Sequence, residues 1–253
     1  MTALHGRRPL PVALQLYTLR AAAAADLLGT LDAVAALGYE GVELAGLHGV
    51  EPAAVRARCD ALGLAICAAH VAVERFEHEE VVVGAELLAL GCDTIVFPSL
   101  PAGEQGIAVA RVAGAARAAR AAGLAAAFHN HADELRRGPD GTRAWDALVA
   151  VEGLGLELDL GWAWVAGADP ASLLRSVAGR VPLVHVKDHL ADGADCPVGD
   201  GEVGYGALLP EIVAAGARWL VVEQDEPGED PLAACARSLA GLRAMDAPAP
   251  AAA

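Results

Sequence analysis

The chain has 253 residues, of which 55% are hydrophobic and 20% are charged, and its formal net charge is −15. This composition excludes disordered and fibrous proteins, and the acidic excess argues against binding to nucleic-acid phosphates or to an anionic membrane. Among 18 basic residues the only lysine is Lys187. The five cysteines form no C-x-x-C pair, and no apolar run is long enough for a signal peptide or a membrane span. We therefore expect a reduced, cytoplasmic protein.

Short apolar runs alternate along the chain with longer segments of helical spacing. The predicted strands cover residues 12–17, 41–45, 65–70, 94–98, 125–131, 155–160, 183–188 and 219–224. Their spacing suits units of one strand, one helix and two short loops. Glycines stand where several of the helices would end, at Gly38, Gly63, Gly91, Gly123 and Gly216.

Continuous apolar strands that alternate with helices indicate a parallel sheet covered on both faces. Eight such units predict a single α/β domain, a (β/α)8 TIM barrel over residues 1–245. A doubly wound open sheet is the alternative, but no G-x-G-x-x-G motif follows the first strand. Residues 246–253 have the composition of a disordered tail.

Polar residues gather where the predicted strands end, which is where a barrel of this kind carries its active site. They are Gln15, Glu43, His70, His129, Asn130, His131, Asp159, His185, Lys187, Asp188, Glu223, Gln224 and Asp225. Each one alone is most often a solvated loop residue or a helix cap, but their coincidence at one level predicts a common site. Strand alternation places His129 with His131 on one face, and His185 with Lys187 on one face.

A convergent set of carboxylates and imidazoles suits a divalent ion such as Mn²⁺, Mg²⁺, Co²⁺ or Zn²⁺. Asp159, His185 and Glu223 come from three consecutive strands, and each can present one ligand to a common centre. The fifth strand would close the remaining side of the ion.

Seven motifs in the chain resemble those of the xylose isomerase-like TIM barrels, the sugar phosphate isomerase/epimerase group that includes inosose dehydratases and keto-sugar epimerases. They are QLYTLR (15–20), LGYEGVELAG (37–46), FHNHADEL (128–135), LELDLGWA (156–163), VHVKDH (184–189), VGDGEVGYGALL (198–209) and VVEQDEP (221–227). The resemblance implies one divalent ion, with Mn²⁺ as the leading candidate, held by strands five to eight. Asp159, His185 and Glu223 match this ligand pattern.

The chain departs from the family pattern on the fifth strand, where HNH occupies the place of a ligand glutamate. We take Glu134, reaching back from the following loop, as the fourth ligand. His129 and His131 are the alternatives.

The resemblance implies an enzyme that acts on a keto-sugar or related polyol. A divalent ion bound to the carbonyl and a neighbouring hydroxyl acidifies the α C–H and stabilises the enediolate that forms when the proton is removed. Return of the proton gives isomerisation or epimerisation, and loss of a β-hydroxyl gives dehydration. We therefore expect a metal-dependent isomerase or epimerase. The alternative is a lyase that uses the same site, either similar to inosose dehydratase or eliminating from a keto-glycoside. Two further hypotheses rank below it: a hydrolase similar to apurinic endonucleases, and a barrel that binds sugar without catalysis.

Roles within this site follow from the chemistry of each side chain. Glu223 or Glu134 is the expected base, His131 the second acid or base, and Lys187 the cation that contacts a substrate oxygen. The candidate substrate-binding residues are Glu43, His70, His129 and Trp162. No lysine or arginine flanks the glycine-rich loop after the seventh strand, which favours an unphosphorylated sugar. The expected partner is a small-molecule sugar or cyclitol substrate. A second copy or a partner subunit is compatible with the sequence.

Overall fold

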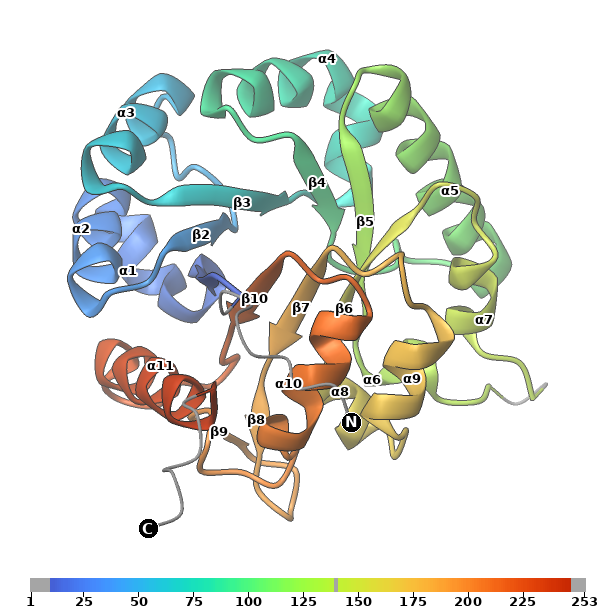
Figure 1. Cartoon of the computed structure of the whole chain (residues 1–253). Coiled ribbons are helices and arrows are strands. Elements are labelled where there is room, and N and C mark those ends of the chain that lie inside the picture. The colour runs from blue at the N-terminus through green and yellow to red at the C-terminus, as the bar shows by residue number, and fades with distance from the viewer. Residues whose placement is uncertain (1–9, 139–140, 247–253) are drawn as a thin grey trace, which may run out of the picture.

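The structure, a computed structural model, describes residues 10–138 and 141–246. Within these residues eight parallel strands close into a barrel in the order β1-β10-β7-β6-β5-β4-β3-β2, with helices around the outside (Figure 1). The predicted TIM barrel is confirmed, because the sheet closes where a doubly wound sheet would stay open. The strands are β1 (Val12–Gln15), β2 (Gly41–Leu44), β3 (Ala65–His70), β4 (Thr94–Phe97), β5 (Ala125–His129), β6 (Gly155–Asp159), β7 (Leu183–Val186) and β10 (Trp219–Val222).

Helices follow the strands and form the outer layer. They are η1 (Leu16–Leu19), α1 (Arg20–Ala25), α2 (Leu27–Leu37), α3 (Pro52–Leu62), α4 (Val73–Leu90), α5 (Gln105–Ala121), α6 (Ala132–Leu135), α7 (Ala144–Val149), α8 (Leu160–Val165), α9 (Pro170–Ser176), α10 (Tyr205–Ala214) and α11 (Pro231–Asp246). The α2 helix illustrates how the sequence sets their limits. Asp26 accepts the Gly29 N–H at its start, and Gly38 ends it with a φ of 94°.

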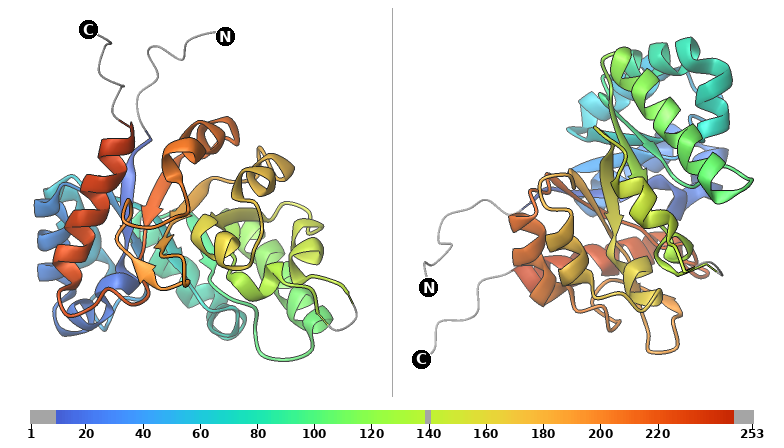
Figure 2. Two further views of the ribbon diagram at one scale, coloured as in Figure 1. Left: turned by 90° about the horizontal axis from the view of Figure 1, so that it is seen from below. Right: turned by 90° about the vertical axis from the view of Figure 1, so that its right-hand side faces the viewer.

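The last helix closes the ring of helices against the first ones (Figure 2). The Tyr39 hydroxyl donates to the carbonyl of Cys235 in α11 at 2.9 Å. Apart from Asp246, which ends α11, the predicted tail at 246–253 lies outside the described residues. Within the described residues, no helix has the length and apolarity that crossing a membrane requires.

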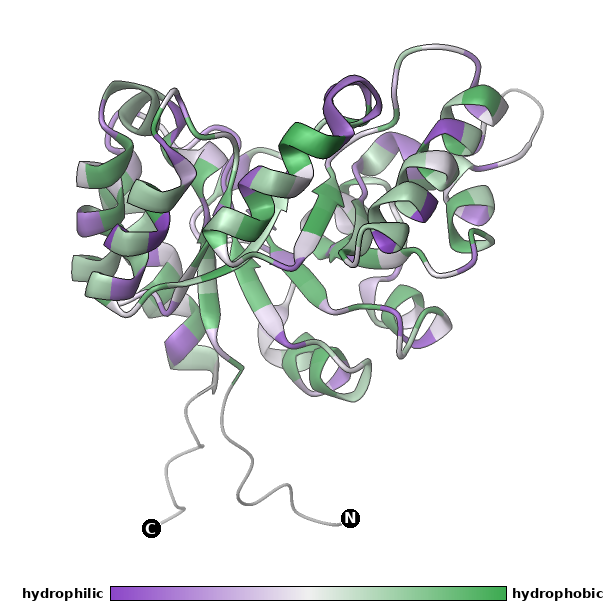
Figure 3. Cartoon of the chain, turned by 90° about the horizontal axis from the view of Figure 1, so that it is seen from above, coloured by the Kyte–Doolittle hydropathy of each residue, from purple (hydrophilic) through white to green (hydrophobic). Residues whose placement is uncertain are grey.

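The inside of the barrel has an apolar layer beneath a polar one. Small or medium apolar side chains fill its lower part: Ala13, Ala68, Val96, Ala127, Leu183 and Val221. Since strand side chains alternate, the next inward position on a strand lies two residues later, nearer the carboxyl end. Two residues after Ala13, Ala127 and Leu183 the chain has Gln15, His129 and His185. Figure 3 shows the strands largely in green, with most purple residues on the surrounding helices and loops.

A small hairpin extends from the seventh strand (Figure 1). Here β8 (Asp188–His189) pairs antiparallel with β9 (Asp195–Cys196). The predicted strand at 183–188 is therefore divided, with Lys187 between β7 and β8. Tyr205 explains the break, because its hydroxyl accepts the Lys187 N–H at 3.0 Å and donates to the Lys187 carbonyl at 2.8 Å.

Candidate metal centre

Four buried side chains from adjacent strands meet at the carboxyl end of the barrel. His129 ends β5, Asp159 ends β6, His185 lies on β7 and Glu223 follows β10. One ligand atom from each lies within 4.8 Å of the others. The structure thus brings the predicted Asp159, His185 and Glu223 together and supplies His129 as the fourth side chain. We call these four residues the ligand group.

Each imidazole of the ligand group turns one ring nitrogen toward the carboxylates. Nδ1 of His185 lies 2.9 Å from Oε2 of Glu223, and Nε2 of His129 lies 3.2 Å from Oδ2 of Asp159. The other nitrogen of His129, Nδ1, faces the Pro98 carbonyl at 3.4 Å. A proton on that outer nitrogen leaves a lone pair directed into the group, which is the arrangement of histidine ligands in metal sites.

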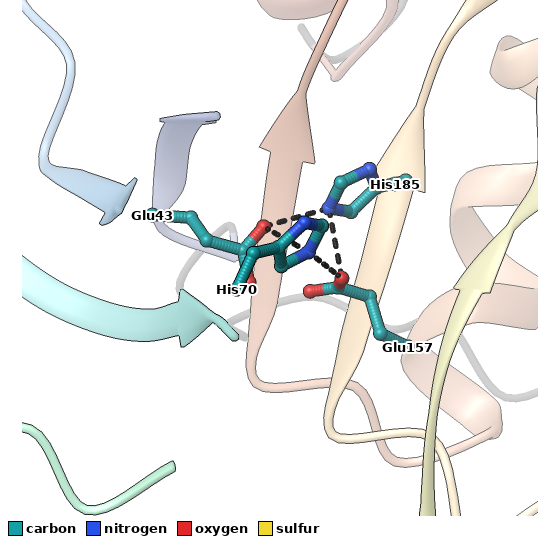
Figure 4. Close-up of side chains that lie close together, drawn as sticks. All are labelled: Glu43, His70, Glu157 and His185. Atoms are coloured by element: carbon teal, nitrogen blue, oxygen red, sulfur yellow. Dashed lines mark hydrogen bonds and ion pairs between the residues drawn. The ribbon is translucent and has the colours of Figure 1, made fainter. Parts of the chain in front are cut away.

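A second group lies on the Nε2 side of the His185 ring (Figure 4). Nε2 of His185 is 2.8 Å from Oε2 of Glu43 and 3.1 Å from Oε2 of Glu157. Nε2 of His70 is 2.7 Å from Oε2 of Glu157 and 3.3 Å from Oε2 of Glu43. We call Glu43, His70, Glu157 and His185 the deep group. It supplies carboxylate acceptors that fix the ring of His185.

The charges of the deep group compensate one another in a position that is buried except for the His70 side chain, which is 10% exposed. Burial raises the pKa of the Glu157 carboxyl, and the neighbouring Glu43 raises it further. Burial acts in the same direction on Glu43, but His70 and His185 hold its pKa well below the usual range. Burial opposes the charged form of His70, yet the two glutamates raise the pKa of His70 to about 10. One further oxygen of each glutamate, Oε1, has no hydrogen-bond partner among the described residues.

Glu157 is a site residue that the sequence reasoning missed. It lies within an apolar run, whereas the prediction rests on the polar residues that close each run. Strand alternation gives the signal that identifies it, because Glu157 is two residues before Asp159 and therefore faces the same side of β6.

Lys187 lies beside the ligand group, and its side chain is only 1% exposed. Its Nζ is 2.9 Å from Oε2 of Glu223 and 3.5 Å from Oδ2 of Asp159. Burial opposes the ammonium form, but Glu223, Asp159 and Asp225 together raise the pKa of Lys187 above its ordinary value. Burial likewise opposes the ionised form of Glu223, but Lys187 and His185 keep its pKa well below the usual range. Both groups are therefore charged at neutral pH.

Glu134 does not join either group, although it was the favoured fourth ligand. Its Oε2 accepts the backbone N–H of His131 at 2.7 Å, which caps the short α6 helix. This hydrogen bond holds the carboxylate at the start of the helix, and His129 stands at the strand-five position of the ligand group instead.

Aromatic rings line the side of the ligand group that faces α6 and α8. The His131 ring is 4.8 Å from that of His129 and 5.8 Å from that of Trp162, measured between centroids. Trp162 is half-buried, and its ring lies 5.3 Å from the ammonium of Lys187. Its backbone N–H donates to Oδ1 of Asp159 at 2.7 Å, so this carboxylate of the ligand group also begins α8.

The glycine-rich loop after β9 directs its amides toward a protein carboxylate. Asp188 accepts the N–H groups of Gly199, Gly201 and Val203 at 2.9 to 3.2 Å. Backbone amides arranged in this way would otherwise suit a phosphate. Since Asp188 already occupies them, this loop offers those donors to no second anion.

Comparison with known proteins places the chain among TIM barrels. Residues 31–245 match the family described as xylose isomerase-like TIM barrel. A sugar phosphate isomerase/epimerase structure from Parabacteroides distasonis is 22% identical, covers 96% of each chain and has a TM-score of 0.79. An L-ribulose 3-epimerase structure is 18% identical and covers 94% of this chain and 96% of its own, with a TM-score of 0.72.

A probable 3-DHS dehydratase from Bacillus anthracis has the same fold. It is 15% identical, covers 94% of this chain and 99% of its own, and has a TM-score of 0.73. No curated protein gives a significant sequence match. At these identities the structural similarities establish the fold.

Proposed function

The chain belongs to the xylose isomerase-like TIM barrel family, and from this membership and the geometry of its ligand group we propose that it is a divalent-metal-dependent isomerase or epimerase of a keto-sugar or related polyol. The observation that carries the proposal is the ligand group itself. Two carboxylates and two imidazoles, each with one ring nitrogen turned inward, form a donor set that suits Mn²⁺ and similar ions. A group of this composition, buried at the carboxyl end of a barrel, has no evident packing role.

His129, Asp159, His185 and Glu223 would hold the ion. When bound, a divalent ion polarises the carbonyl of a keto-sugar and so makes the adjacent C–H more acidic. Glu43 and Glu157 accept the proton of His185 Nε2 and keep its other nitrogen aimed at the ligand group.

The protein's own side chains supply the proton transfers. We assign the base to Glu223, which lies in the ligand group with its carboxylate ionised, and the partner acid or base to His131 on the facing side. Glu134 is the alternative base, reached only if it leaves the α6 cap. The protonated His70 and the ammonium of Lys187 place positive charge beside the position where negative charge develops on the substrate oxygens.

The substrate that fits this site is an unphosphorylated sugar or cyclitol. Asp188 fills the amides of the loop that could receive a phosphate, and Trp162 offers a half-buried ring face to a sugar. Loss of a β-hydroxyl after the same proton abstraction would give a dehydratase, so the products decide between the two reactions.

The test is proton exchange in D₂O. Protein loaded in turn with Mn²⁺, Mg²⁺, Co²⁺ and Zn²⁺ is incubated with a panel of keto-sugars and inosose, and deuterium at the α carbon is measured by NMR and mass spectrometry. We expect exchange with at least one substrate and a large loss in Glu223→Gln. Asp159→Ala should lose both the ion and the exchange. Absence of exchange with every ion and substrate would overturn the proposal.

A further inference from the structure

The single lysine of the chain pairs with two carboxylates that a metal ion would also need. Its ammonium pairs with Oε2 of Glu223 at 2.9 Å and lies 3.5 Å from Oδ2 of Asp159. These two oxygens also lie against His185 and His129, inside the ligand group. The ammonium and a divalent ion therefore require the same two carboxylates, and their positive charges repel each other at this short range.

Lys187 has a third partner that the ligand group does not include. Oδ2 of Asp225 lies 2.8 Å from Nζ, and the Asp225 side chain is 29% exposed, compared with 5% for Glu223. Asp225 therefore marks the more open end of the site. An ammonium that gives up Asp159 and Glu223 still keeps one charged hydrogen bond, and that bond draws it toward this end.

The surroundings of Lys187 allow its side chain to change partner while its backbone stays in place. Tyr205 binds both the N–H and the carbonyl of Lys187, and Gly161 packs directly on its backbone. The side chain itself crosses the face of Trp162, a contact without directional hydrogen bonds. A compact ammonium on a flexible stem can turn from one carboxylate to another, whereas a planar guanidinium has a fixed fork of donors.

We propose that Lys187 is the resident counter-cation of the ion-free site, and that a divalent ion displaces its ammonium from Asp159 and Glu223 onto Asp225, which then positions it for the substrate. This inference rests on the proposed metal dependence. Asp225 is in this account a positioning residue, and Lys187 is a competitor of the ion before it becomes a partner of the substrate.

The chemical reactivity of Lys187 tests the displacement in the unaltered protein. Because the chain has one lysine, acetylation by acetic anhydride at constant pH can be followed by mass spectrometry on a single peptide, relative to a lysine-containing reference peptide in the same tube. Saturating Mn²⁺ should raise the labelling rate of Lys187 at least roughly tenfold, the factor that corresponds to ~1.4 kcal/mol of lost ion pairing. In Asp159→Asn, which should not bind the ion, Mn²⁺ should leave the rate unchanged.

Ion affinity measured by calorimetry provides an independent readout. Lys187→Met removes the competitor and should bind Mn²⁺ more tightly than the wild type, while Lys187→Arg keeps the charge and should not. Asp225→Asn removes the alternative partner, so Mn²⁺ should bind more weakly although Asp225 is no ligand.

The outcomes separate this inference from the proposed function. If the wild type binds Mn²⁺ but labelling of Lys187 does not change, the displacement is refuted while the metal site stands. Unchanged or weaker Mn²⁺ affinity in a folded Lys187→Met variant would refute it as well. If the wild type binds none of the four ions, both the inference and the proposed function are overturned.

Discussion

Gly161 lies where the first turn of α8 meets the backbone at Lys187, and an alanine there would disturb both. A Cβ atom added to Gly161 would stand 2.5 Å from the carbonyl oxygen of Lys187 and 2.7 Å from its Cβ. Two of the three nearest atoms are backbone, so no side-chain rotation relieves the contact. The first turn of α8 would have to move, and with it Trp162, whose N–H is bonded to Asp159.

The size of the effect follows from two opposing contributions. Overpacking of a rigid contact costs about 1–3 kcal/mol and sometimes more, whereas replacing a helical glycine by alanine gains up to about 1 kcal/mol. We expect Gly161→Ala to lower the free energy of unfolding by roughly 2 kcal/mol. Gly114→Ala is the matched control, since Gly114 lies inside α5 with no atom near its missing Cβ, and it should be neutral or stabilising.

Urea unfolding followed by circular dichroism measures both variants, and Mn²⁺ calorimetry measures the site. Gly161→Ala should unfold at a lower urea concentration than the wild type and bind Mn²⁺ more weakly, because Asp159 is coupled to the displaced turn. If Gly161→Ala matched Gly114→Ala in both measurements, the close packing of α8 on Lys187 would not hold and its link to the ligand group would fail.

Three further predictions concern the deep group and the ion. Glu157→Gln keeps every side chain of the ligand group but weakens the acceptor that contacts Nε2 of His185, so Mn²⁺ affinity should fall roughly 10–100-fold. Glu152→Gln on the outer surface is the control, and equal Mn²⁺ affinities of the two variants would show that Glu157 does not support the site. Burial lowers the pKa of His185, but its glutamate partners raise that pKa well above the usual value, so a bound ion must displace a proton from His185. Mn²⁺ binding in weakly buffered solution should therefore acidify the medium, and Mn²⁺ affinity should rise with pH. Mn²⁺ binding without proton release would contradict this prediction. His70 has a pKa of about 10 in the folded protein, so its contribution to stability is complete below the unfolded pKa of about 6.5 and is lost as pH rises through 10. Between these two pH values the chelator-treated wild type should lose at most about 5 kcal/mol of unfolding free energy relative to His70→Gln. Parallel pH profiles of the two proteins would refute this role of His70.

The starts of the strands were predictable, but their ends were less so. Apolar runs and helix-ending glycines are local features, and all eight predicted strands begin where the structure begins them. The end of β7 depends on Tyr205, which lies 18 residues further along the chain and binds the backbone of Lys187. The predicted fifth strand extends to His131, but β5 ends at His129 because the Glu134 cap starts a helix there. Such contacts leave no periodic trace.

The residues of the candidate site also fall into some that local sequence features indicate and some that depend on contacts in the folded chain. Asp159, His185 and Glu223 were found because each closes a strand, and the topology of a barrel brings such residues together. Glu157 was missed because its neighbours are leucines, and only alternation reveals that it faces inward. Glu134 stays away from Asp159, His185 and Glu223 because its carboxylate accepts the backbone N–H of His131. This contact depends on the packing of α6, so residue spacing does not show whether Glu134 or His129 joins them.

The ligand group and the deep group also bear on the stability of the barrel. Asp159 and Glu223 are fully or almost fully buried, and carboxylates in that position destabilise a fold unless cations compensate them. Lys187 supplies one charge, and it shares that charge with Asp225. An ion that binds the folded chain alone adds the missing compensation, and at about 100 times its dissociation constant it would stabilise the fold by ~2.7 kcal/mol. Metal binding and thermal stability should therefore rise together, and both should be lost in Asp159→Ala. A melting temperature that does not respond to saturating Mn²⁺ would mean that Lys187 and the histidines already balance these carboxylates.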